Sequence, residues 1–145
     1  MLLGQYIQKI DQKGRTILPA KIKKEIGQKV ILSRWYENSL AIFEGVAWNK
    51  IIQEATLGLS VSEAARDTQR FLLGGAYEVE LDDKGRFLIP YILREFGKFS
   101  VEIIFLGLGN RVEIWDRKLW EEREEKITKE AEKLLERAQG VYNEH

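Results

Sequence analysis

The sequence predicts an α+β fold in which a small, mainly β unit with a short helix is built twice. The first observation is an internal repeat, because DQKGR at 11–15 returns as DDKGR at 82–86. The second is the alternation of apolar and polar residues over 5–10 and 76–81, which is typical of half-buried strands. The third is a proline and a glycine that bracket a short segment after each copy, as at the two ends of a helix.

Each copy predicts the same order of elements. The strand at 5–10 or 76–81 leads into a glycine turn and a second short apolar run, which together indicate a hairpin. A short helix follows between the proline and the glycine, and the glycine is expected to be left-handed. These pairs are Pro19 with Gly27 and Pro90 with Gly97. Two further strands complete each unit, at 29–34 and 39–44 in the first copy and at 100–106 and 111–115 in the second.

Helices are predicted outside the two copies. Segments 46–55 and 60–73 have helical patterns, and Ser60 with Glu63 has capping-box spacing. A long helix is predicted after Trp120, as far as about Ala138. The domain organisation follows, with one compact domain made of a first repeat at 5–48, a helical linker at 49–75, a second repeat at 76–120 and a C-terminal helix at 121–145.

Composition excludes several classes of function. The 145 residues include no cysteine, which removes disulfides and thiolate chemistry. The only histidine is His145, so a Ser-His or Cys-His pair has no plausible partner. Asp82 and Asp83 are neighbours on a strand pattern and should point to opposite faces, which disfavours a carboxylate pair. We therefore expect no enzyme, no catalytic or metal site and no cofactor. Apolar runs are far shorter than the ~20 residues of a spanning helix, and the N-terminus lacks signal-peptide features, so a cytoplasmic protein is expected.

Charge distinguishes the two copies. The chain has a formal net charge of zero, but residues 9–34 carry eight bases against two acids, a local balance of +6. Residues 80–106 carry four bases against five acids, a balance of −1. Such asymmetry points to a polyanion-facing surface on the first copy, with the second copy serving packing or assembly.

The repeated D-x-K-G-R motif has a physical interpretation. Gly14 and Gly85 are expected to supply a positive φ, and the side chains of Asp11 and Asp82 to accept backbone N–H bonds across the turn. The arginine that follows is then held by a stiff turn. Two interpretations remain open: a purely structural turn whose arginine pairs with a carboxylate, or an arginine presented to a ligand.

The pieces DQKGRTILPAKIKKEIG, RFLLGGAYEVELDDKGRFLIPYILREFG and LGLGNRVEIWDRKLW resemble the MraZ family of bacterial transcriptional regulators, in order and spacing. The resemblance covers essentially the whole chain. It implies two AbrB-like swapped-hairpin half-barrels, which form one pseudo-two-fold double-split β-barrel, plus a C-terminal helix. It also implies a nucleoid-associated protein that binds double-stranded DNA with G-rich direct repeats upstream of the division and cell-wall gene cluster, usually as a repressor and as a homo-oligomeric ring.

Candidate site residues follow from the resemblance and from the charge. The resemblance places the expected DNA contact on Arg15 and the following basic pair on Lys23 and Lys24; where relatives can carry a further arginine, this chain has Gln8 beside Lys9. Arginine can span O6 and N7 of guanine, which suits a G-rich target. The full DNA-binding set is Lys9, Lys13, Gly14, Arg15, Lys21, Lys23 and Lys24, with Asp11, Asp82, Gly85 and Arg86 assigned to the structure of the motif.

Two points complete the expectations. A ring requires exposed apolar surface, for which Trp35, Tyr36, Phe43, Trp48, Trp115 and Trp120 are candidates, although core packing is the commoner role of such residues. Neither a membrane nor a small-molecule substrate is expected as a partner. The alternative function is a ring-forming protein-interaction adaptor that keeps the fold without the DNA contact.

Overall fold

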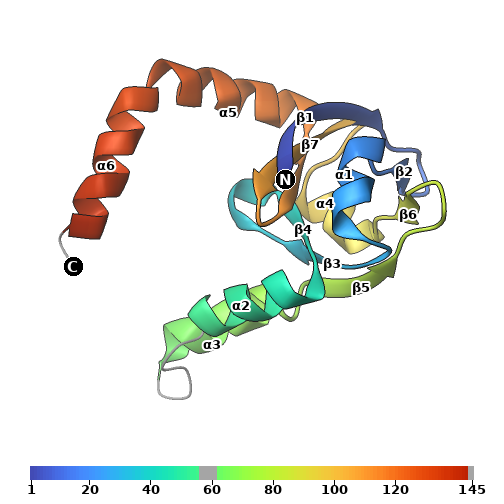
Figure 1. Cartoon of the computed structure of the whole chain (residues 1–145), viewed down its shortest axis with the longest axis horizontal. Helices are drawn as coiled ribbons and strands as arrows, with labels where there is room; N and C mark the ends of the chain where they lie inside the picture. The colour runs from blue at the N-terminus through green and yellow to red at the C-terminus, as the bar shows by residue number, and fades with distance from the viewer. Residues whose placement is uncertain (56–61, 144–145) are drawn as a thin grey trace.

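The computed structural model describes residues 1–55 and 62–143. In this part of the chain the strands are β1 (Leu2–Lys9), β2 (Arg15–Ile17), β3 (Lys29–Arg34), β4 (Leu40–Phe43), β5 (Ala76–Glu80), β6 (Arg86–Leu88), β7 (Glu102–Gly109) and β8 (Val112–Asp116). The helices are α1 (Ala20–Ile26), α2 (Gly45–Ala55), α3 (Glu63–Leu72), α4 (Tyr91–Phe96), α5 (Arg117–Lys129) and α6 (Ala131–Asn143), with a 3₁₀ turn η1 (Tyr36–Asn38). Figure 1 shows the strands gathered around α1 and α4, with α2–α3 and α5–α6 extending outward.

Strand pairing exchanges partners between the two copies. The six-stranded sheet has the order β1-β7-β8-β4-β3-β5, and β2 pairs with β6 in a separate two-stranded ribbon. Exchanging each strand for its repeat equivalent, β1 for β5 and so on, reverses this order and leaves it otherwise unchanged. The predicted α+β fold with two swapped-hairpin halves and pseudo-two-fold symmetry is therefore confirmed.

The swap corrects one local expectation. The sequence suggests that the strand before each motif and the short run after it pair as a hairpin, whereas β1 pairs with β7 and β2 with β6. The turn itself closes locally, since the Gly14 N–H donates to the Asp11 carbonyl at 3.0 Å. Only the strands on either side of it find their partners in the other copy. The hairpins β3–β4 and β7–β8 form as predicted.

The two turns bind each other's copy reciprocally. The Leu18 N–H donates to the Gly85 carbonyl at 2.9 Å, and the Ile89 N–H donates to the Gly14 carbonyl at 2.8 Å. Both glycines have positive φ, at 90° for Gly14 and 83° for Gly85, as the motif predicts. Each turn closes within its own copy, but the residue that follows β2 or β6 bonds to the turn of the other copy.

One core joins the copies. Its fully buried side chains come from both, and they include Leu18 and Ile22 of the first copy and Ile89 and Leu93 of the second. Burial of a side chain of this size contributes about 1.5–3 kcal/mol. The apolar faces of α1 and α4 thus close the core from opposite copies.

The short helices match the prediction apart from their ends. Pro19 and Pro90 are the residues just before the first helical position, and their carbonyls accept the first helical N–H groups. Gly27 has the expected positive φ, but Gly97 has φ −76°, so the left-handed expectation is wrong there. Lys98 takes the positive φ instead. A Cβ atom at position 97 would lie 2.5 Å from the Phe99 ring. Glycine is therefore favoured there because a side chain would clash.

The peripheral helices also differ in their ends. Helix α3 is capped by Ser62, whose Oγ accepts the Ala65 N–H at 3.3 Å, while the predicted cap Ser60 lies outside the described residues. The C-terminal helix starts earlier than predicted, at Arg117 after its cap Asp116, and is divided at Glu130 into α5 and α6. In the described part of the chain, no helix is long and apolar enough to cross a membrane.

The candidate aromatic surface is largely interior. Phe43, Trp48 and Trp115 are buried, and Trp35 and Trp120 are partly buried. Of the six, Tyr36 is the exposed one, at 46%. Core packing therefore accounts for most of this set.

A glycine substitution tests the reciprocal turn. A Cβ on Gly14 would lie 2.5 Å from the Ile89 carbonyl oxygen, so Gly14→Ala combines an unfavourable φ with a clash across the copies. The unfavourable φ alone costs about 1–2 kcal/mol. We expect Gly14→Ala to lose more free energy of unfolding than that, measured by urea denaturation. The matched control is Gly109→Ala, at φ 80° with nothing within 4 Å of the added Cβ. Equal losses in the two variants would contradict the account.

Candidate nucleic-acid interface

The β2–β6 ribbon presents one exposed face and one buried face. Its register places Arg15 opposite Leu88 and Ile17 opposite Arg86, with Thr16 opposite Phe87 between them. Thr16 and Phe87 are buried, because side chains alternate along a strand and these two point toward the core. Both motif arginines therefore lie on the same outward face. In Figure 1 the ribbon is at the end of the molecule away from α6.

Each arginine is held by the aspartate of its own motif. Asp11 Oδ1 accepts the N–H groups of Lys13 at 3.0 Å and Arg15 at 2.9 Å, and Oδ2 accepts Nε of Arg15 at 2.7 Å. The second copy repeats this geometry. Asp82 Oδ1 accepts the N–H groups of Lys84 at 2.9 Å and Arg86 at 2.8 Å, and Oδ2 accepts Nε of Arg86 at 2.5 Å. The predicted side-chain bonds across the turn are present in both copies.

The ion pair leaves the outer nitrogens of the guanidinium available. Only Nε bonds to the aspartate, and among residues 1–55 and 62–143 neither Nη of Arg15 has a hydrogen-bond partner. The Arg15 side chain is 63% exposed and that of Arg86 58%. The pairing that a purely structural turn predicts is thus present, yet it also leaves the two Nη groups unbonded on an exposed side chain. One geometry satisfies both interpretations of the motif.

Hydrogen bonding also changes the acidity of the aspartates. The backbone N–H of Arg15, and then its guanidinium, lower the pKa of Asp11 below its ordinary value. For Asp82 the guanidinium of Arg86 is the larger cause and the backbone N–H of Arg86 the next, and the pKa is again lowered. Both carboxylates therefore stay charged at neutral pH and keep their arginines in place.

The predicted lysines do not all surround Arg15. Lys13 lies in the same turn, and Lys9 lines an open hollow of about 840 Å³ together with both arginines and both aspartates. Lys21 and Lys24 are exposed on α1 and line a different hollow, beside residues 1–3. The electropositive surface of the first copy therefore extends from the ribbon around α1.

Lys23 has a different environment. It is half-buried, its amine donates to the backbone carbonyl of Asp83, and its side chain packs against Gly85. Arg94 does the equivalent in the other copy, donating from Nη1 to the Gln12 carbonyl and from Nε to the Ile89 carbonyl, both at 3.0 Å. Lys23 and Arg94 each lie four residues after the proline of their copy. This shared spacing is the sequence signal that could have identified the pair. These two side chains clamp the opposite turn, and a DNA contact by Lys23 stays a prediction.

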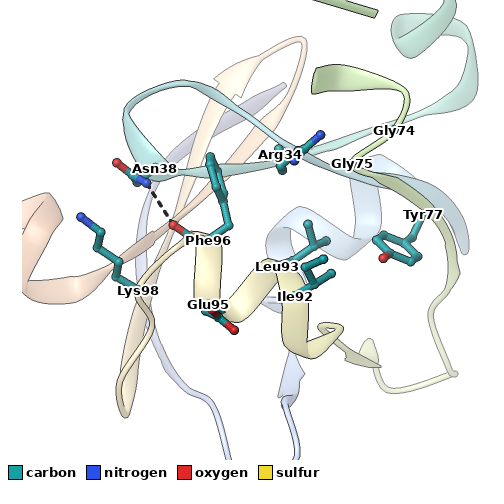
Figure 2. A pocket seen from close by; sticks show the side chains of 10 residues that line it. All are labelled: Arg34, Asn38, Gly74, Gly75, Tyr77, Ile92, Leu93, Glu95, Phe96 and Lys98. Carbon is teal, nitrogen blue, oxygen red and sulfur yellow. Dashed lines mark hydrogen bonds between the residues drawn. The ribbon is translucent and has the colours of Figure 1, made fainter. Parts of the chain in front are cut away.

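A third hollow lies between the β3–β4 connection, the turn at 74–75 and α4 (Figure 2). Two of its polar side chains, Arg34 and Asn38, bond within the chain. Arg34 donates to the carbonyls of Phe71 and Arg70, both at 3.0 Å, and Asn38 donates to the carbonyl of Phe96 at 3.1 Å, the bond drawn in Figure 2. This hollow joins the two copies. Within the described ranges, no group of three or more His, Cys, Asp or Glu side chains could hold a metal ion.

Comparison with known proteins decides the family. The sequence profile of the family described as "MraZ protein, putative antitoxin-like" matches residues 1–71 and again 72–141. The chain belongs to the MraZ family. The "Transcriptional regulator MraZ" of Caldanaerobacter subterraneus subsp. tengcongensis is 45% identical over 123 residues, which cover 84% of this chain and 85% of the relative. The "Transcriptional regulator MraZ" of Moorella thermoacetica is 36% identical over 137 residues, which cover 94% of this chain and 96% of the relative.

The family assignment agrees with the geometry. The boundary between the two matched segments falls near the end of α3, so each contains one D-x-K-G-R turn. Membership in the MraZ family supports a DNA-binding regulator of transcription. A solved structure, "The solution structure of PHS018 from pyrococcus horikoshii", covers 79% of the chain and 88% of its own, at 14% identity and a TM-score of 0.31. That likeness is too distant to bear on function.

The two aspartates predict how stability depends on pH. Their pKa values are lowered on folding from an ordinary 3.8, so their contribution is complete above about that pH and is lost as pH falls through the lower folded values. We expect the urea concentration at the unfolding midpoint of the wild type to decrease as the pH is lowered below about 4. The double variant Asp11→Asn, Asp82→Asn should show a smaller decrease.

The matched control is Asp83→Asn. It removes the adjacent carboxylate of the same turn, which accepts a bond from Gln28 at 3.5 Å and neither closes the turn nor pairs with its arginine. Urea midpoints measured from pH 7 to pH 3 compare the three proteins. A double variant with the wild-type pH dependence would contradict the assignment.

Proposed function

We propose that this MraZ protein is a transcriptional regulator that binds G-rich direct repeats in double-stranded DNA through the exposed face of the β2–β6 ribbon. The observation that carries the proposal is the exposed side chain of Arg15, whose Nε is fixed by Asp11 while neither Nη has a hydrogen-bond partner in the described part of the chain. A two-stranded ribbon fits the major groove, and an arginine fork matches O6 and N7 of guanine. Because the bond from Nε to Asp11 already restricts the rotamers of Arg15, binding DNA costs less side-chain entropy.

The exposed lysines supply the sequence-independent part of binding. Lys9 and Lys13 flank the ribbon, and Lys21 and Lys24 extend the basic surface along α1. Contacts of this kind neutralise phosphates and position a protein on the duplex without reading sequence. Gly14 is buried in the same turn as Lys13, and its carbonyl accepts the Ile89 N–H, so we propose that it serves DNA binding by shaping the turn that carries Lys13 and Arg15.

The charge of the two copies favours Arg15 as the leading base contact. Arg86 shares its geometry and its face, but the sequence segment that carries Arg86, residues 80–106, has a charge balance of −1, against +6 for residues 9–34 of the first copy. The assignment of Arg86 to structure therefore stays a prediction that variants can test. Because the two arginines lie on one ribbon only two residue pairs apart, a duplex bound by one is within reach of the other.

We further propose that the protein works as a homo-oligomeric ring in the cytoplasm, associated with the nucleoid, and represses the division and cell-wall gene cluster. One ribbon presents a small contact surface. Linked subunits on successive direct repeats raise the effective concentration of each further contact, and so multiply weak single affinities. The family resemblance supports this assembly and its target.

Replacing Arg15 tests the base contact. We expect Arg15→Ala to weaken binding to DNA from immediately upstream of the protein's own gene by about tenfold or more, because a bidentate contact discriminates by about 1–3 kcal/mol. A mobility-shift assay measures this, with scrambled repeats as the control DNA. Arg86→Ala is the matched variant, since it removes the same side chain from the same ribbon, and we expect a smaller effect. A larger effect of Arg86→Ala would reverse the assignment, and no effect of either would favour the protein-interaction adaptor.

Salt dependence tests the phosphate contacts. We expect the logarithm of the association constant to fall linearly with the logarithm of salt concentration, with a slope of about −0.9 for each phosphate neutralised. Lys13→Gln and Lys21→Gln should each make that slope less negative by about one. Each variant should weaken binding to scrambled DNA and to native DNA by the same factor. Fluorescence anisotropy across a salt series provides the slopes. A flat plot for the wild type would rule out binding led by phosphate contacts.

A further inference from the structure

Two large aliphatic side chains, Ile17 and Leu88, are exposed on the same face of the ribbon as the two arginines. Ile17 is 44% exposed and Leu88 50% exposed, although each neighbours a buried residue of its own strand. Within residues 1–55 and 62–143, neither belongs to a hydrophobic cluster. The interior of the protein therefore does not account for their side chains.

The four outward side chains alternate in type. Arg15 stands directly opposite Leu88, and Ile17 directly opposite Arg86. Cross-strand neighbours have Cβ atoms about 4.5–5.5 Å apart, so each arginine has one aliphatic beside it across the ribbon and another two residues along its own strand. The pseudo-two-fold axis passes through the Thr16–Phe87 pair and relates the halves of this pattern. The apolar groups are thus part of the same surface as the arginines.

We propose that Ile17 and Leu88 contact the C5-methyl groups of thymines close to the guanines that the arginines bind. This inference rests on the proposed function. In the major groove, the thymine methyl is the apolar feature that distinguishes one base pair from another, and aliphatic side chains recognise it by contact. An aliphatic side chain beside a guanine-binding arginine therefore determines which base accompanies the guanine.

The spacing of the ribbon limits where that thymine lies. Residues i and i+2 of a strand are separated by about 6.6 Å, close to two base-pair steps of about 3.4 Å. Residues opposite each other across the ribbon are closer than that. The contacted thymine is therefore expected within about two base pairs of the guanine.

Uracil substitution tests the contact because it removes only the methyl group. The probe is DNA from upstream of the protein's own gene, prepared with thymine or with uracil throughout. We expect the wild type to bind the uracil probe at least about fourfold more weakly, the size expected for one buried methyl or methylene group. The double variant Ile17→Ala, Leu88→Ala should bind the thymine probe more weakly and bind both probes equally. Val46→Ala is the control, since Val46 is 84% exposed on α2, and it should discriminate as the wild type does.

The outcomes separate this inference from the proposed function. If the wild type binds both probes equally, or the double variant still discriminates between them, the methyl contact is wrong while DNA binding stands. If the wild type binds neither probe in preference to scrambled DNA, the proposed function itself fails. If the double variant alters the size of the assembly and leaves discrimination intact, the aliphatic pair belongs to a subunit contact and the inference is overturned. Urea denaturation of the double variant confirms that it is folded.

Discussion

The reciprocal hydrogen bonds between the two D-x-K-G-R turns are the constraint on which the structure depends. Each turn exposes a glycine carbonyl that accepts an N–H group from the strand end of the other copy. Lys23 and Arg94 strengthen the same exchange by reaching across to the opposite turn. Because a buried backbone group without a partner is costly, neither copy is expected to fold this region alone. The strand order of the six-stranded sheet shows the same exchange between the copies.

The same turns create the candidate interface. Pairing β2 with β6 brings together two motifs that lie 71 residues apart, and the alternation of a strand sends both arginines outward while Thr16 and Phe87 enter the core. The carboxylates of Asp11 and Asp82 have two tasks, closing the turn through backbone N–H bonds and fixing the arginine through Nε. Stability and presentation of the guanidinium therefore have one physical cause. An exposed ion pair of this kind contributes little stability by itself, so its geometry matters more than its strength.

The remaining helices leave this surface open. Helices α2 and α3 pack on the sheet face formed by Ala41 and Phe43, and α5 packs near Trp115. In Figure 1 these arms extend away from the β2–β6 ribbon. The arms therefore do not cover the proposed DNA-binding face of the ribbon.

The sequence by itself determined the repeat, the α+β class, the positive φ of Gly14 and Gly85 and the bonds of Asp11 across its turn, because each is a local property of a few adjacent residues. The motif also singled out Arg15 as the candidate DNA contact, which stays a prediction. The resemblance to the MraZ family implied the swapped hairpins. Only the tertiary structure decided which strands pair across the two copies, that Arg86 shares a face with Arg15, that Lys23 clamps the opposite turn, and that Ile17 and Leu88 remain exposed. These outcomes depend on which strands pair, and pairing between residues far apart in the chain is set by the common core and by the carbonyls that each turn offers the other. A sequence pattern shows that a strand has one buried and one exposed face. The partner strand decides which residues of the other copy share each face.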